Sequence, residues 1–214
     1  MEKTMRIRIT FIEPVLGTCP NNPDLYRSYI GSKSPDAATV EDEVKALGAD
    51  AVAENSMTVF PALEDGTPYL YDYQIKGAMK GACGFLKGIP GTKSSAVKAY
   101  KKKIDGHIFP SPRRIIFHNV DEIGECQRPL RAQTAQGERV SLAMSEEIPA
   151  GAWIEFEVLL LDEHDEGLVK EWFNYGKLNG IGQWRNSGKG RYKWEELDEK
   201  GNVIDGNFNP QTDI

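Results

Sequence analysis

The sequence has few cysteines and no closely spaced pair of them. Its three cysteines, Cys19, Cys83 and Cys126, lie far apart, and none belongs to a CxxC motif. Neither a structural zinc site nor a disulfide framework is therefore indicated. An odd number of cysteines fits a reducing, intracellular compartment.

Long apolar runs are also missing. No run approaches the roughly 20 apolar residues that a membrane-spanning helix needs. The stretch from Met1 to Arg8 is charged and then strand-like, which is not the pattern of a signal peptide. We therefore expect a cytoplasmic protein without a membrane partner.

The short motifs of common enzymes are absent as well. There is no Walker loop, nucleophile elbow, HExxH pair or zinc pair, and the acidic turn Asp162–Glu166 lacks EF-hand spacing. No metal and no cofactor are therefore expected. Of the three histidines, only His107 lies in a basic region, so it is the one candidate for a general base. The balance favours binding without turnover.

What the sequence does have is an uneven distribution of charge. The formal net charge is −6, yet residues 74–114 hold ten Lys or Arg and one acid. Residues 36–65, in contrast, hold eight acids and one lysine. Local potential steers a charged partner more than total charge does. The basic region therefore predicts a polyanionic partner, and the acidic region 36–65 offers a surface for a host protein.

A glycine-rich stretch near the end of the sequence is the centre of the candidate site. It interleaves glycines with cations and aromatic rings: Gly180, Gly182, Trp184, Arg185, Gly188, Lys189, Gly190, Arg191 and Tyr192. Glycine permits close approach, successive backbone amides form an anion-binding concavity, and Trp184 or Tyr192 can stack on a base. The stretch predicts a site for RNA or single-stranded DNA. A glycine-rich hairpin turn with solvated charges is the alternative.

Two further basic segments are assigned to the same site. The helix expected over residues 74–87 begins with Lys76, Gly77 and Lys80, where the free amides of a first turn favour an anion. The second segment contributes Lys101, Lys102, Lys103, Arg113 and Arg114. We expect these side chains to converge beside the glycine-rich stretch. A solvated helix end is the alternative for the lysine run.

The order of apolar patterns predicts an α+β fold. Period-two alternation indicates strands, and helical spacing indicates helices over 38–47, 74–87 and 166–178; the strands are expected over 5–13, 56–63, 68–73, 113–120, 125–135, 138–144, 152–162 and 190–197. This order suits an antiparallel sheet with helices on one face, in one or two ferredoxin-like (RRM-like) units. We expect a single domain at 1–205, with an acidic insertion at about 17–65 and a polar tail at 206–214.

Three features, in sequence order, resemble the RAMP superfamily of RNA-binding subunits of CRISPR effector complexes and their repeat-processing relatives. They are the helix start Ile75–Lys80, the segment Phe109–Asn119 with the strand pair Glu138–Asp162, and the glycine-rich stretch Gly180–Arg191. The likeness covers the first strand and most of the chain from about residue 69 onward. Residues 17–65 match nothing in the family, and Gln183-Trp184 stands where the usual loop has glycine or a basic residue.

The resemblance implies a RAMP-type fold that binds single-stranded nucleic acid, with RNA favoured over DNA. The family's repeat-processing nucleases need no metal, which implies a metal-independent endoribonuclease acting through His107 as the alternative. The compact length and the absence of an internal repeat favour a standalone protein, and small acidic proteins of this kind resemble those that phages and prophages encode. A third hypothesis is therefore an anti-defence protein that binds a host component or a nucleotide ligand.

Overall fold

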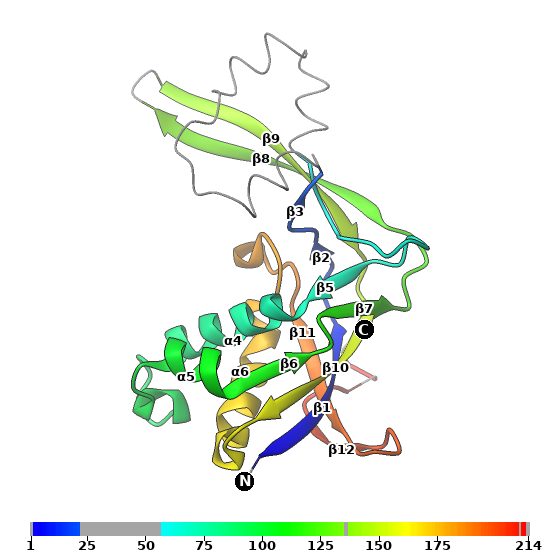
Figure 1. The fold of residues 1–214 in the computed structure, drawn as a ribbon. Helices are drawn as coiled ribbons and strands as arrows, with labels where there is room; N and C mark the ends of the chain where they lie inside the picture. Colours follow the sequence, from blue (N-terminus) through cyan, green and yellow to red (C-terminus); the bar gives the residue numbers. More distant parts are fainter. Residues whose placement is uncertain (1, 22–56, 135–136, 210, 213–214) are drawn as a thin grey trace.

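The computed structural model describes residues 2–21, 57–134, 137–209 and 211–212. In these ranges three α-helices cover one face of an antiparallel sheet, so the predicted α+β class is confirmed (Figure 1). The helices are α4 (Asp72–Leu86), α5 (Tyr100–His107) and α6 (Glu166–Asn179). None of the helices described is long and apolar enough to cross a membrane. The helix predicted over 38–47 lies outside the described residues.

The main sheet has seven strands and joins early and late parts of the sequence. Its order is β12-β11-β1-β10-β7-β5, and β6 pairs with the other end of β10. Every pairing in it is antiparallel. Its strands are β1 (Lys3–Phe11), β5 (Tyr69–Tyr71), β6 (Ile108–Ser111), β7 (Arg114–His118), β10 (Trp153–Leu160), β11 (Tyr192–Leu197) and β12 (Val203–Gly206).

The core lies between this sheet and the helices, and its residues follow the two periodicities of the sequence. In β1 the alternate side chains Met5, Ile7, Ile9 and Phe11 are fully buried. In α4 the buried side chains recur at the spacing of one helix face: Ile75, Met79, Ala82, Cys83 and Leu86. These two sets belong to one continuous apolar cluster.

A second sheet corrects the expectation of a single sheet. The long hairpin of β8 (Gly124–Thr134) and β9 (Gly137–Ile148) extends well beyond the helices (Figure 1). The short strands β2 (Val15–Leu16), β4 (Thr58–Val59) and β3 (Cys19–Pro20) complete this sheet, in the order β2-β9-β4-β3. After β1 the chain passes Pro14 and pairs with β9 instead of continuing in the main sheet.

Two predicted segment ends also differ from the structure. Leu63 N donates to Thr67 O at 2.9 Å across a turn at Asp65-Gly66, between the strands predicted over 56–63 and 68–73. The strands on either side of it, however, are shorter than predicted and join different sheets. The polar tail was predicted to begin at residue 206, but Gly206 still belongs to β12. The next residue, Asn207, exchanges hydrogen bonds with the backbone of Trp194.

Gly176 allows α6 to pack directly on β11. A Cβ at this position would lie 2.0 Å from Cζ of the buried Tyr192, so a side chain does not fit. Gly176→Ala should lower the free energy of unfolding by roughly 1–3 kcal/mol, measured by urea denaturation. The matched control is Gly106→Ala in α5, where an added Cβ meets nothing within 4 Å and should be neutral or stabilising. Equal midpoints for Gly176→Ala and the wild type would contradict this packing.

Glu155 on the helix-free face of the sheet makes stability depend on pH. Burial opposes its ionisation, but hydrogen bonds from Arg8 and Arg6 outweigh burial and hold the Glu155 pKa below its usual value. A lowered folded-state pKa stabilises above the unfolded pKa of about 4.3, and this stabilisation is lost as pH falls through the folded value.

The variant Glu155→Gln should therefore be less stable than the wild type at pH 7. The difference should be at most about 1 kcal/mol, because the carboxylate is partly solvated. Urea midpoints measured from pH 7 downward should converge below about pH 4. Glu199→Gln, in the exposed turn after β11, is the control and should show no such convergence. If the difference in urea midpoint between the wild type and Glu155→Gln stayed constant across this pH range, ionisation of Glu155 would not be the cause of the pH dependence.

Candidate nucleic-acid interface

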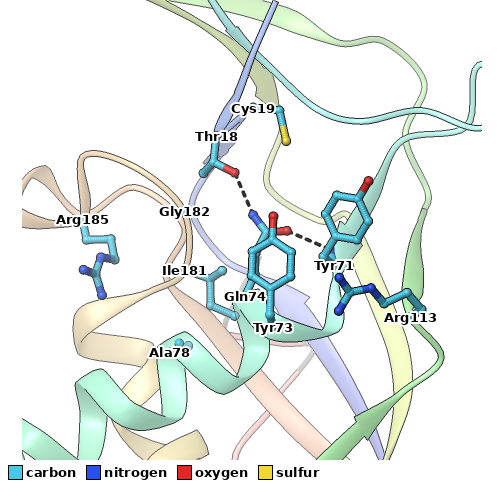
Figure 2. Close-up of a pocket in the computed structure, with 11 residues that line it drawn as sticks. Thr18, Cys19, Tyr71, Tyr73, Gln74, Ala78, Arg113, Ile181, Gly182 and Arg185 are labelled. Carbon is cyan, nitrogen blue, oxygen red and sulfur yellow. Dashed lines mark hydrogen bonds between the residues drawn. The ribbon is translucent and has the colours of Figure 1, made fainter. Parts of the chain in front are cut away.

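A cleft of about 700 Å³ opens between the start of α4 and the glycine-rich loop, residues 180–191 (Figure 2). Four parts of the chain line it: Thr18, Cys19, Tyr71, Tyr73, Gln74, Gly77, Ala78, Arg113, Ile181, Gly182 and Arg185. A concave site of this size with a few convergent polar groups is the usual form of a ligand-binding site. Four of these residues were predicted site residues: Gly77, Arg113, Gly182 and Arg185.

Backbone hydrogen bonds hold the glycine-rich loop in shape. Ile181 N donates to Gly190 O at 2.9 Å, and Gly190 N donates to Pro14 O at 2.7 Å. Gly190 has φ +71°, and a Cβ there would lie 1.8 Å from Ile181 O, so only glycine fits. The loop is therefore closed on itself and tied to the chain that leaves β1.

Arg185 is the cation that this loop brings over α4. Its Nη1 would lie 3.7 Å from a Cβ placed on Gly81. One turn earlier, a Cβ on Gly77 would meet nothing within 4 Å, so Gly77 leaves the helix surface bare. The guanidinium thus lies beside a stretch of helix without bulky side chains.

Tyr71 and Tyr73 form another wall of the cleft, and the sequence analysis did not identify them. Their rings are stacked, with centroids 5.2 Å apart and an interplanar angle of 17°. The guanidinium carbon of Arg113 lies 5.3 and 5.4 Å from the two ring centroids. The alternation Tyr69-x-Tyr71-x-Tyr73, which runs into the first turn of α4, was the signal that could have found them. Tyr73 is 51% exposed, so part of this aromatic surface is accessible to a ligand.

Gln74 fixes this wall relative to the segment after β2. Its side-chain carbonyl accepts a hydrogen bond from Tyr71 N at 2.7 Å, and its amide donates to Thr18 Oγ1 at 2.7 Å (Figure 2). Cys19 follows Thr18 in the lining, and burial raises the pKa of its thiol. Thr18 and Cys19 were missed because the sequence analysis assigned residues 17–65 to an insertion.

The two predicted arginines of the basic segment lie near the tyrosines. Arg113 forms an ion pair with Asp72 at 2.5 Å, while its side chain stays 65% exposed. Arg114 lies 5.5 Å from the ring of Tyr69, whose pKa burial raises to about 12. Both cations thus sit against aromatic rings rather than beside the glycine-rich loop.

The predicted lysines of α4 point elsewhere, which corrects the expected convergence. Lys80 Nζ lies 2.6 Å from Asp105 Oδ1, and Lys76 Nζ donates to Asp105 O at 3.0 Å. Lys76 also lies 4.5 Å from the Phe109 ring, and burial lowers its pKa. Both side chains are therefore directed toward α5 and β6 because Asp105 attracts them.

The lysine run also lies outside the cleft. Lys101, Lys102 and Lys103 belong to α5, which packs against α4 and β6 and supplies none of the lining residues. Lys103 is engaged with the buried Asp165, at 2.6 Å. His107, the weak candidate for a general base, is the exposed last residue of α5 and is likewise absent from the lining.

Within the glycine-rich stretch, Tyr192 requires a correction. It begins β11, is 3% exposed and packs edge-on against Phe11, so it cannot stack on a base. Trp184 is not itself a lining residue of the cleft, but it lies between Gly182 and Arg185, which are, and it is 38% exposed, so its ring can reach a base at the edge of the cleft. Lys189 pairs with Glu147 of β9 at 2.6 Å, and Arg191 Nε donates to Leu178 O at 3.2 Å. Gly180 and Gly188 have positive φ, so their part in the loop is to adopt a backbone conformation that other residues rarely take.

The remaining site predictions concern acids and metals. Residues 36–56 of the acidic region lie outside the described part of the chain, so the structure does not describe the partner surface assigned to them. Among the described residues, no three His, Cys, Asp or Glu side chains gather as a metal ion would require.

Comparison with known proteins finds similarity at the level of the chain trace. No protein-family model and no curated protein matches the sequence. The structure is similar to a chain in the "Cryo-EM structure of the Type III-B Cmr-beta bound to cognate target RNA", with 10% identity and a TM-score of 0.49. The match covers 92% of this chain and 59% of that chain, which is therefore considerably longer.

Proposed function

We propose that the protein binds single-stranded nucleic acid, RNA in particular, in the cleft between α4 and the glycine-rich loop. The observation that carries this proposal is the stacked pair Tyr71–Tyr73 beside Arg113, in a cleft that Arg185 also lines (Figure 2). Aromatic rings stack on bases of any sequence, and cations neutralise the backbone, which is the usual combination in single-strand sites. A duplex would not offer its base faces to these rings.

The proposed binding is non-catalytic. Among the described lining residues, the ionisable side chains are those of Cys19, Tyr71, Tyr73, Arg113 and Arg185. A general base works best with a pKa near the operating pH, which arginine and tyrosine do not have. Burial raises the pKa of the Cys19 thiol further from neutrality. His107 lies outside the cleft, so it does not support the alternative that an endoribonuclease reaction takes place there.

For the fold we propose a RAMP-type, ferredoxin-like domain that runs to the end of β12 at Gly206. The elements β1, α4, β7, β10, α6 and β11 follow one another as β-α-β-β-α-β, and four of these strands pair in the order β11-β1-β10-β7. The glycine-rich loop then lies between α6 and β11, close to the start of α4. The strands of the second sheet are additions to this arrangement.

Two variants separate the phosphate contact from the base contact. Binding of a labelled uridine-rich RNA would be followed by fluorescence anisotropy over a series of salt concentrations. Arg185→Gln should weaken binding and reduce the slope of log K against log salt by about 0.7, because one phosphate contact of a single strand is lost. Tyr73→Ala should weaken binding roughly 5- to 150-fold without changing the slope, which corresponds to one lost base stack.

Lys200→Gln, in the exposed turn between β11 and β12, is the matched loss of a cation and should bind as the wild type does. Competition with single-stranded DNA and with duplex RNA identifies the preferred strand. The proposal fails if the wild type does not bind RNA or single-stranded DNA at low salt.

The double variant Lys101→Gln/Lys102→Gln distinguishes the cleft from the basic segment expected at first. These side chains are exposed on α5, outside the cleft, so affinity and salt slope should stay close to those of the wild type. A reduction in slope of about 1.4, two phosphate contacts, would show instead that the strand runs over α5.

A further inference from the structure

Arg128 in β8 connects the second sheet to the glycine-rich loop. Its Nη2 donates to Gln183 Oε1 at 2.7 Å, and its Nη1 donates to Ser145 Oγ of β9 at 3.1 Å. Its guanidinium carbon lies 5.4 Å from the centroid of the Trp184 ring. The side chain thus contacts two consecutive residues of the loop from a strand that is distant in sequence.

Arg128 is a buried charge with neutral partners. The residue is 7% exposed, and no carboxylate of the described residues forms an ion pair with it. Taking a guanidinium out of water is unfavourable unless hydrogen bonds and other contacts compensate. Tryptophan is the best aromatic partner in cation–π pairs, arginine is the more frequent cation, and desolvation strengthens the contact. The contacts that compensate this charge are therefore largely those with the loop.

Trp184 itself has a backbone that needs support. It has φ +53° and ψ 36°, a left-handed conformation that is uncommon for a large side chain. Such strain persists where the surroundings hold the residue, and it concentrates at binding sites. Arg128 on the ring and Gln183 beside it supply that support, while Trp184 remains 38% exposed.

We propose that Arg128 is a positioning residue that fixes Gln183 and Trp184 so that the exposed part of the indole stacks on a base of the bound strand. This inference rests on the proposed function. Arg128 acts through Trp184 and makes no phosphate contact, because the guanidinium is buried and held by Gln183 and Ser145. The second sheet would thereby determine the shape of the binding loop.

The test uses Arg128→Met, Arg128→Lys and Trp184→Ala in the full chain, with Gln127→Ala on the exposed side of β8 as the matched control. The first readout needs no RNA. It is the quenching of Trp184 fluorescence by acrylamide, isolated from the other tryptophans by subtracting the signal of the protein that carries Trp184→Phe. Arg128→Met should increase this quenching, and Arg128→Lys should restore part of the protection because it keeps the cation. The control should leave quenching unchanged.

The second readout is RNA affinity over the salt series. Arg128→Met should lose most of the affinity that Trp184→Ala loses, with an unchanged salt slope. The double variant Arg128→Met/Trp184→Ala should bind no more weakly than Trp184→Ala alone, because both changes remove the same stack. Additive losses, or a slope reduced by about 0.7, would make Arg128 a direct phosphate contact and overturn the positioning role.

Two further outcomes are kept apart by the design. If the wild type binds no RNA, the proposed function falls, and unchanged quenching in Arg128→Met would reject the positioning role separately. If Arg128→Met does not fold, Gln183→Ala cuts the same hydrogen bond from the partly exposed loop side. Gln183→Ala should then increase quenching and weaken binding in the same way, and wild-type behaviour in both readouts would overturn the inference.

Discussion

The antiparallel pairing of β1 with both β10 and β11 positions everything in the candidate site. Ile9 pairs with Ile154 on one side and with Trp194 on the other, so a strand from the start of the sequence lies between two late ones. The hydrogen bonds continue past the end of β1, where Ile12 N donates to Arg191 O and Gly190 N donates to Pro14 O. The glycine-rich loop is thus an extension of the central ladder, and its place over α4 follows from that ladder.

The charges around α4 divide according to the acids available to them. Asp105 is the one acid of the basic segment 74–114, and it engages both Lys76 and Lys80. Arg185 has no carboxylate partner among the described residues and lies at the cleft. Arg113 is paired with Asp72, and its guanidinium also lies against the ring of Tyr73 while much of the side chain stays exposed. Electropositive character at the cleft therefore comes from two arginines rather than from a broad basic surface.

Much of the main fold could be predicted because it depends on local periodicity. The buried face of α4, the alternation in β1 and the bounds of α6 all follow from the spacing of apolar residues. The same rule could have placed Tyr192 in the core, since Tyr192 and Trp194 alternate inward along β11. The loop was identified from its glycines, whereas Gly176 in the helix before it was not, although among the loop glycines only Gly190 leaves less room for a Cβ.

The rest depends on contacts between distant segments, which periodicity does not report. Nothing local shows that β9 pairs with β2, or that Thr18 meets Gln74. The direction of Lys80 was equally hidden, because helical spacing gives the face of a side chain but not the neighbour that faces it. Arg128 looked like one charge in a polar strand, and only its contacts with Gln183 and Trp184 give it a role.

The central place of β1 also has a consequence for the order of folding during synthesis. β1 is synthesised before β10, which begins at Trp153, and before β11, which begins at Tyr192, so both of its edges stay unpaired until those strands emerge. Sheets that depend on such long-range pairing form slowly and expose their apolar strands meanwhile. The nascent chain therefore has an interval in which the apolar side chains of Ile7, Ile9 and Phe11, buried in the folded protein, are open to contact with other chains.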